Sequence, residues 1–202
     1  MRIGYKLMSE EHGPQALVAN ARAAEAAGFD FVALSDHFYP WLEEQGHSPF
    51  AWSVLGAVAQ ATERVGICTA VTCPNGRYHP AIVAQAAATV ALLAEGRFTL
   101  GLGSGERLNE HVTGDVWPAV GVRQEVFAEA VEVIRLLLEG RERYFDGRFY
   151  DLEDARLFDR PETPPALAIA AGGPQAAALA GQKGDGRAAG GLRRGRGGDP
   201  AP

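Results

Sequence analysis

The chain has 202 residues, of which 47% are hydrophobic and 22% charged, and its formal net charge is −6. Such proportions are typical of a globular protein with one sizeable core, and the negative charge excludes the basic surface that binds nucleic acids and anionic membranes. No signal-peptide pattern follows Met1 and no apolar run approaches about 18 residues, so we expect a cytoplasmic protein that does not span a membrane.

The chain has two cysteines, Cys68 and Cys73, with no pair of histidines nearby. This pattern fits neither a disulfide framework nor a zinc site. We therefore expect no bound metal, and two reduced thiols in or near the core.

The first half of the chain alternates short apolar segments with helical patterns. Strands are expected at residues 2–7, 30–34, 65–71 and 98–102, and helices at 14–28, 49–62 and 81–94. Pro14 and Pro80 suit the first turn of a helix, and Gly28 suits the position after a helix end. Because one helix follows each strand, the pattern predicts parallel strands joined by crossover helices.

Parallel strands with crossover helices form either an open doubly wound sheet or a closed eightfold barrel. The polar residues favour the barrel, because they directly follow the carboxyl ends of strands, where barrel enzymes build their sites. These residues are Asp36, His37, Thr72, Ser104, Glu106 and Asn109. An open sheet places its site by a similar rule at its switch point, so it stays the alternative.

Three alternating glycines end the strand at 98–102. They are Gly101, Gly103 and Gly105. Glycine adopts positive φ readily and lets backbone N–H groups approach an anion. The segment is therefore predicted to be the floor of a site for a phosphate-bearing cofactor, with Ser104 and Asn109 as donors and Glu106 as a neighbouring carboxylate. A plain turn is the alternative. The dinucleotide-binding fingerprint is excluded, because its third glycine would fall at Glu106 and its acidic residue near Gly121.

The second half begins with a long loop and a helix at residues 123–139, which has the strongest helical periodicity in the chain. Residues 143–150 then form two aromatic-rich runs around Asp146-Gly147. This pattern predicts a β-hairpin with a type I′ turn, inserted before the next strand.

A fifth strand of the main sheet is expected at residues 166–170, followed by a short helix that begins near Pro174. The pair Gly172-Gly173 lies between them. Glycines at the start of a helix are typical of anion-binding sites.

Residues 187–202 contain five Gly, four Arg, three Ala and two Pro, and almost no side chain that a core could bury. We expect this segment to be disordered. Because the composition changes directly after Gly186, our hypothesis is that the reading frame is lost there; a natural flexible tail is the alternative. The domain at 1–186 would then be an incomplete barrel of about five βα units, whose fifth strand has an unpaired edge.

Four segments in series resemble the luciferase-like flavin and deazaflavin oxidoreductases, and most of all the coenzyme F420-dependent glucose-6-phosphate dehydrogenase branch. They are SDHFYPW at 35–41, TAVTCPNGRYHP at 69–80, GLGSGERLNEH at 101–111 and AAGGP at 170–174. The resemblance covers residues 1–186. It implies a (β/α)8 TIM barrel, with the deazaflavin F420 lying across the carboxyl ends of the strands, and a homodimer for the full-length form.

The resemblance also implies roles for single residues. Asp36 would bond the edge of the deazaflavin ring, and His37 would be the base that takes the substrate's hydroxyl proton. Trp41 would form an apolar wall, and Glu106 would be an acid or a charge-stabilising partner. Further cofactor contacts would be Ala70, Val71, Cys73, Ser104, Gly105, Asn109, Ala171, Gly172 and Gly173, with a cis peptide bond between Ala70 and Val71. The other histidines, His12, His47, His79 and His111, are interpreted as surface or structural residues.

The expected reaction is hydride transfer between the deazaflavin and a small alcohol or carbonyl substrate. The substrate stays open, because the phosphate clamp of the sugar-phosphate enzymes comes largely from the later part of their barrel. Two alternatives remain. One is an FMN-dependent monooxygenase of the same superfamily, and the other is a truncated, inactive fragment or a half-barrel that pairs with another chain.

Overall fold

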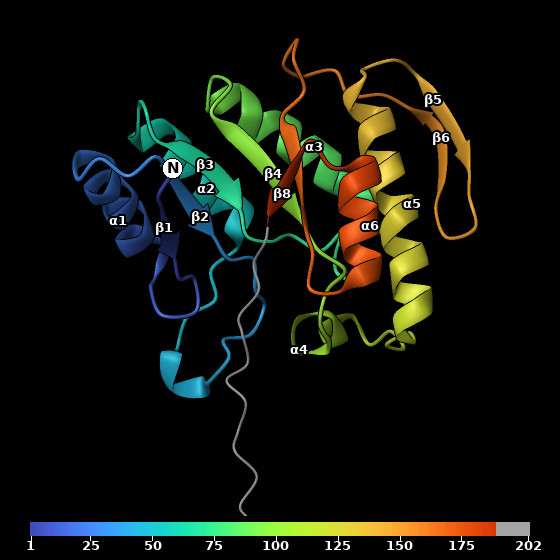
Figure 1. The fold of residues 1–202 in the computed structure, drawn as a ribbon, viewed down its shortest axis with the longest axis horizontal. Helices are drawn as coiled ribbons and strands as arrows, with labels where there is room; N and C mark the ends of the chain where they lie inside the picture. The colour runs from blue at the N-terminus through green and yellow to red at the C-terminus, as the bar shows by residue number, and fades with distance from the viewer. Residues whose placement is uncertain (189–202) are drawn as a thin grey trace, which may run out of the picture.

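The computed structural model describes residues 1–188, which form a six-stranded parallel sheet (Figure 1). The strands are β1 Gly4–Leu7, β2 Phe31–Leu34, β3 Gly66–Thr69, β4 Phe98–Leu102, β7 Ala166–Ala170 and β8 Gly186–Ala188. The sheet order β1-β2-β3-β4-β7-β8 follows the chain order without a reversal. A doubly wound sheet reverses its order at a switch point, whereas an unreversed order is that of the strands in a (β/α)8 barrel. The described part therefore confirms the incomplete barrel.

Within residues 1–188, five longer helices connect the strands. They are α1 Pro14–Ala26, α2 Ala51–Ala61, α3 Pro80–Leu93, α5 Val120–Leu138 and α6 Pro174–Lys183. Each packs against the next, from α1 on α2 to α5 on α6. The loops at the carboxyl ends of the strands hold three single-turn helices, η1 Glu43–Gln45, α4 Arg107–Glu110 and η2 His111–Thr113, and Figure 1 shows α4 at the lower edge. None of the described helices is long and apolar enough to cross a membrane.

The core lies between the sheet and the helices, because alternate strand residues point to opposite faces. The face toward the helices carries Leu7, Val32, Leu34, Ile67, Leu100, Leu102, Leu167 and Ile169, each at most 2% exposed. The register places a different row on the other face, made of Lys6, Ala33, Cys68, Thr99 and Ala166. Large apolar side chains thus fill the space between the sheet and the helices, and mostly small side chains line the opposite face of the sheet.

Helix ends follow the local sequence signals. Gly28 after α1 has φ 84° and Gly140 after α5 has φ 76°, the left-handed conformation that favours glycine beyond a helix end. At the start of α3, Nδ1 of His79 accepts a 3.2 Å hydrogen bond from the backbone N–H of Ala81. Burial lowers the pKa of His79, which keeps the ring neutral and able to accept. His79 is therefore a structural residue, as interpreted from the sequence.

The inserted hairpin is present, but its predicted type I′ turn is wrong. Strands β5 (Arg143–Asp146) and β6 (Asp151–Ala155) pair antiparallel, and residues 147–150 connect them. Neither Asp146 nor Gly147 has the positive φ that a type I′ turn needs. The reason lies outside the hairpin. The carboxylate of Glu129 on α5 accepts hydrogen bonds of 2.8–3.1 Å from the backbone N–H groups of residues 148–150, which draws the connection onto the helix.

The sheet continues one strand beyond the predicted fifth. Residues Gly186–Ala188 form β8, which pairs with Ala168–Ala170 of β7. Asp185 anchors this pairing, because its N–H donates to the carbonyl of Leu167 at 2.9 Å and its carboxylate accepts from the Leu167 N–H at 3.0 Å. The predicted unpaired edge of the fifth strand is therefore wrong, and the sheet includes residues 187 and 188 of the predicted tail. The rest of the predicted tail, 189–202, lies outside the described residues.

Candidate active site

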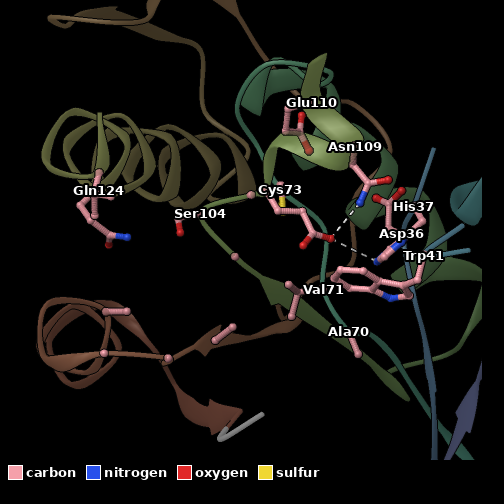
Figure 2. Close-up of a pocket in the computed structure, with 18 residues that line it drawn as sticks. Asp36, His37, Trp41, Ala70, Val71, Cys73, Ser104, Asn109, Glu110 and Gln124 are labelled. Atoms are coloured by element: carbon pink, nitrogen blue, oxygen red, sulfur yellow. Dashed lines mark hydrogen bonds and ion pairs between the residues drawn. The ribbon is translucent and has the colours of Figure 1, made fainter. Parts of the chain in front are cut away.

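A cavity of about 920 Å³ opens at the carboxyl ends of the strands. Its volume lies in the range of about 300–1,000 Å³ that small-molecule sites occupy. Figure 2 shows Asp36, His37 and Trp41 on one side of it, and Ser104 and Gln124 on the other. Within residues 1–188, no three His, Cys, Asp or Glu side chains are grouped so that they could hold a metal ion.

All but one of the residues to which the family resemblance assigns a role line this cavity. They are Asp36, His37, Trp41, Ala70, Val71, Cys73, Ser104, Gly105, Glu106, Asn109, Gly172 and Gly173. The exception is Ala171, which packs against the hydrophobic core instead. Two other alanines line the cavity nearby: Ala170, which precedes Ala171 in the chain, and Ala176 of α6.

His37 follows the carboxyl end of β2, and its side chain is 12% exposed. Its Nδ1 lies 3.2 Å from the carbonyl oxygen of Tyr39, and because a carbonyl only accepts, this contact places the ring proton on Nδ1. Nε2 lies 3.5 Å from Oε1 of Glu10 and 3.7 Å from Oε1 of Glu106. The ring centroid of Trp41 lies 5.2 Å from that of His37. The free nitrogen of His37 thus faces two carboxylates beside an aromatic wall.

Glu10, the more buried of these two carboxylates, was missed by the sequence analysis. Its side chain is 2% exposed, and Oε2 accepts a 2.6 Å hydrogen bond from the hydroxyl of Ser35. Ser9 supports the same corner, since its hydroxyl donates to the carbonyl of Ser35 at 3.0 Å. Glu10 follows the carboxyl end of β1, so the positional rule that selected His37 would also have selected Glu10.

Asn109 is engaged at both ends of its side-chain amide. Its Oδ1 accepts from the backbone N–H of Phe38 at 2.7 Å and of Tyr39 at 3.1 Å, and its Nδ2 donates to Oε1 of Glu106 at 3.0 Å. The residue is 3% exposed, whereas the Glu106 side chain is 39% exposed. The geometry therefore favours a positioning role for Asn109 over the predicted phosphate contact.

Asp36 is buried in the cavity wall and accepts three side-chain hydrogen bonds. Thr72 donates to Oδ2 at 2.7 Å, and Oδ1 accepts from the Tyr78 hydroxyl at 3.2 Å and from Nη2 of Arg77 at 3.3 Å. Burial, together with the Asp36 charge, raises the pKa of Tyr78, so the phenol stays a donor. These three donors fix the orientation of the carboxylate.

Arg77 also contacts Glu110, a second carboxylate that the sequence analysis missed. The backbone N–H of Arg77 donates to Oε2 of Glu110 at 3.0 Å, and Nε lies 3.5 Å from Oε1. This second contact is an ion pair without an aligned hydrogen bond, since both of its atoms are buried and without a hydrogen-bond partner. Burial raises the pKa of Glu110 even though Arg77 lies beside it.

The glycine run after β4 works differently from its prediction. Only Gly105 has a positive φ, of 79°, whereas Gly101 and Gly103 do not. A Cβ on Gly103 would lie 2.6 Å from Cγ2 of Val71, so glycine is required there by the close approach of the segment after β3. The peptide bond between Ala70 and Val71 is cis, as the resemblance implies.

Both cysteines are free thiols. Burial raises the pKa of Cys68 to about 11 and raises that of Cys73 as well. A protonated thiol is a poor nucleophile. Cys73, in the cavity wall, offers an uncharged surface.

The end of the cavity away from His37 has open space beside glycine. A Cβ on Gly172 or on Gly173, just before α6, would meet no atom within 4 Å. Gln124 of α5, which the sequence analysis missed, also lines the cavity. The cavity thus has ionisable groups at one end and open space at the start of a helix at the other. This arrangement fits an elongated cofactor that carries a reactive ring and a phosphate.

The family model for luciferase-like monooxygenases matches residues 1–196, past the point at which the hypothesis places a lost frame. The chain belongs to this family. It is 48% identical to an F420-dependent glucose-6-phosphate dehydrogenase of Beutenbergia cavernae over 186 residues, which are 92% of this chain and 55% of that protein. It is 45% identical to an F420-dependent hydroxymycolic acid dehydrogenase of Mycobacterium tuberculosis over 184 residues, which are 91% and 51% of the two chains.

Among solved structures of the family, an F420-dependent secondary alcohol dehydrogenase in complex with an F420-acetone adduct superimposes with a TM-score of 0.89 at 42% identity. The match covers 92% of this chain and 57% of that one. The chain thus spans about half the length of the curated relatives it matches. This agrees with six strands where a complete barrel has eight.

Proposed function

We propose that the full-length protein carrying this chain is an F420-dependent oxidoreductase that transfers a hydride between the deazaflavin and an alcohol or carbonyl substrate. One observation carries the proposal: Nε2 of His37, in the cavity wall, lies 3.5 and 3.7 Å from two carboxylates. The relatives at 42–48% identity that are named for F420 support the choice of cofactor.

His37 is the base in this proposal. The Tyr39 carbonyl holds the proton on Nδ1, so Nε2 carries a lone pair that can take the hydroxyl proton of an alcohol. The ring is oriented before substrate arrives. In the reverse direction, the same nitrogen returns the proton to the oxygen of a carbonyl substrate.

Glu10 and Glu106 stabilise the positive charge that His37 acquires. Both carboxylates lie near Nε2, and the buried one, Glu10, is fixed by the Ser35 hydroxyl. Charge stabilisation at a buried position is worth more than in water. Glu106 is the exposed member of the pair, so it offers a route by which the proton reaches solvent.

Other residues of the cavity would hold the cofactor and exclude water. When bound, the deazaflavin would supply the group that accepts or donates the hydride, which carries a pair of electrons. Asp36, with its orientation fixed by three donors, would bind a polar edge of the ring. Ser104 with Gly172 and Gly173 would hold the phosphate, and Trp41 would shield the reacting atoms from water.

Titrating the purified full-length protein with F420 and with FMN tests the proposal. We expect binding of F420, and loss of F420 absorbance when an alcohol is added. A panel that contains a secondary alcohol and glucose 6-phosphate then identifies the substrate class. Tight binding of FMN without binding of F420 would overturn the proposal in favour of a monooxygenase.

We also infer that the full-length protein is a homodimer, joined through α2 and α3. Neither helix contains a charged residue, whereas a helix that faces solvent usually carries charged side chains on its outer face. A groove of about 370 Å³ runs between them, beside the exposed side chains of Phe50, Ile82 and Leu93. Two copies can cover the same uncharged surface on each other about a twofold axis.

Light scattering tests this inference. We expect Ile82→Glu to give a monomer, with Val122→Glu on α5 as the control. A monomeric wild type contradicts the inference.

A further inference from the structure

Three buried side chains join the segments that follow β2, β3 and β4. Asp36 comes after β2, Arg77 after β3, and Glu110 lies on α4, which follows β4. Their side chains are 1%, 7% and 2% exposed. We call them the Asp36–Arg77–Glu110 bridge. Arg77 is its centre, because it contacts both of the other residues.

The contacts of Arg77 reach main chain as well as side chains. Nη2 donates to the backbone carbonyl of Asp36 at 3.2 Å and to its carboxylate at 3.3 Å. On the other side, Glu110 receives the backbone N–H of Arg77 and faces its Nε. The guanidinium therefore holds the backbone of the residue directly before His37. The backbone N–H of Arg77 and the Nε ion pair connect this segment to Glu110 on α4.

Asn109 makes a second connection between the same two segments. Its Oδ1 accepts the backbone N–H groups of Phe38 and Tyr39, which follow His37, and its Nδ2 holds Glu106. Asn109 and Glu110 are neighbours on α4. If the bridge loosens, α4 can move relative to residues 36–39, and the 3.7 Å separation of His37 from Glu106 is no longer fixed.

We propose that Arg77 is a positioning residue, which sets the geometry between His37 and Glu106 through Asp36 on one side and α4 on the other. The effect of Arg77 on catalysis rests on the proposed function. Its effect on the positions of residues 36–39 and α4 does not. Arginine is required because its planar fork reaches a carbonyl, a carboxylate and a second carboxylate at once, whereas a lysine ammonium is a single point on a flexible stem.

The test compares Arg77→Lys with Arg97→Lys in the full-length protein. Arg97 is a matched control, since it also makes several buried contacts: its guanidinium donates to the carbonyls of Ala59, Thr62 and Val65. It directly precedes β4, so it lies at the end of the sheet away from the cavity. Both variants lose hydrogen bonds, but only Arg77→Lys should disturb the site.

Amide hydrogen exchange is the first measurement, and it needs neither cofactor nor turnover. The backbone N–H groups of Phe38 and Tyr39 report whether residues 36–39 stay attached to α4. We expect them to exchange about tenfold faster or more in Arg77→Lys and to be unchanged in Arg97→Lys. Equal exchange at these two amides in both variants would overturn the proposal.

Steady-state kinetics are the second measurement. We expect Arg77→Lys to lower kcat by about 10²-fold while the KM for the alcohol changes about threefold or less, because misplacement of a base acts on the transition state. Arg97→Lys should keep the wild-type kcat. A wild-type kcat in Arg77→Lys refutes the positioning role. If the wild-type protein shows no F420 turnover but exchange is still faster in Arg77→Lys, only the proposed function is refuted. The positioning role of Arg77 then stands.

A second variant covers the case in which Arg77→Lys does not fold. Glu110→Gln keeps the contact of Arg77 with Asp36 and removes the charge at the α4 end. We expect it to fold, to speed exchange at Phe38 and Tyr39, and to lower kcat less than Arg77→Lys does. Unchanged exchange in Glu110→Gln counts against the bridge.

Discussion

The two ring nitrogens of His37 have different surroundings and therefore different roles. The Tyr39 carbonyl engages Nδ1, and the carboxylates of Glu10 and Glu106 lie near Nε2. A flip of the ring would put carbon atoms in the places of both nitrogens, so the contact with Tyr39 and the approach to the two carboxylates would both be lost. One backbone carbonyl thus decides which nitrogen is basic, and the carboxylates decide how well the resulting charge is tolerated.

The first prediction concerns His37→Ala in the full-length protein. Turnover should fall by about 10²-fold or more, because general-base catalysis contributes on that scale. The dissociation constant of F420 should stay within about threefold, since the role removed belongs to the transition state. Stopped-flow kinetics and fluorescence titration measure the two quantities. His47→Ala, at an exposed position, is the control. Equal turnover in His37→Ala and wild type would refute the base assignment.

The second prediction concerns the phosphate end of the cavity. Gly172→Val adds a side chain where no atom lies within 4 Å, so the fold should tolerate it, but the side chain would take space that a phosphate needs. We expect F420 affinity to fall by about tenfold or more, which is about 1.4 kcal/mol, with an unchanged melting temperature. Gly121→Val is the matched control, because Gly121 has equally open space outside this cavity. Undiminished affinity in Gly172→Val would place the phosphate elsewhere. Gly105 is a poorer test site, since its φ of 79° would strain any side chain.

The sequence predicts which residues line the cavity better than it predicts what they do. Position after a strand end is enough to select Asp36, His37 and Glu106, because parallel strands bring their carboxyl ends together. The role of Asn109 could not be predicted, because its partners, two backbone N–H groups about 70 residues away, are set by the path of a loop. Glu10 could have been predicted by the same positional rule.

At the scale of elements, Glu129 shows how one side chain decides the shape of a hairpin. It lies on α5 and accepts three consecutive backbone N–H groups from the connection between β5 and β6. Burial alone would raise the pKa of Glu129, but the amides of residues 148–150 and the charge of Arg148 outweigh it and hold the pKa below its usual 4.5. The carboxylate form is therefore the form that stabilises the hairpin.

The third prediction is a pH-dependent loss of stability in Glu129→Gln. A carboxyl group with a lowered folded-state pKa adds stability above its unfolded pKa, and this is lost as pH falls through the folded value. At pH 7 we expect the free energy of unfolding to drop by about 1 kcal/mol, on the scale of one ordinary hydrogen bond, because solvent screens the charge of Glu129. The difference from wild type should shrink as pH falls below about 4.5 and vanish under more acidic conditions. Urea unfolding at pH 7 and pH 3 measures this. Glu142→Gln, at an exposed position, is the control. An equal loss at both pH values would contradict the role of the charge.

Strand and helix positions in the main sheet follow from local signals, so most were predictable. The apolar run at 98–102 and the run at 166–170 coincide with β4 and β7. The type of the hairpin turn could not be predicted. Asp146-Gly147 is a strong local signal for a type I′ turn, but hydrogen bonds from the hairpin to Glu129 of α5 override it. The strand β8 was missed because its residues lack apolar character, and its pairing depends on Asp185 binding the backbone of β7.

For the whole molecule, the open sheet is the decisive feature. Within residues 1–188, β1 and β8 each pair on one side only, so both present backbone N–H and C=O groups at an edge. Such edges favour association with another chain. The large side chain of Ile3, directly before β1, is also 53% exposed.

The fourth prediction is that the 202-residue chain, expressed alone, gives an oligomeric or aggregation-prone product of low stability with weak F420 binding. Light scattering, thermal unfolding and F420 titration measure these properties. The full-length protein is the control, because its further strands would cover both edges. A monodisperse monomer with a cooperative melt and clear F420 affinity would show that six strands are sufficient.

The unreversed strand order has a consequence for how the chain folds during synthesis. Each strand of the sheet pairs with the one made just before it, apart from the β5–β6 insertion between β4 and β7. A chain that leaves the ribosome at about 5–20 residues per second can therefore add one βα unit at a time to an edge that is already in place. Only the pairing that closes a barrel, between its first and last strands, joins segments far apart in the sequence. Growth along the sheet should be fast, and ring closure should be the slow and vulnerable step of biogenesis.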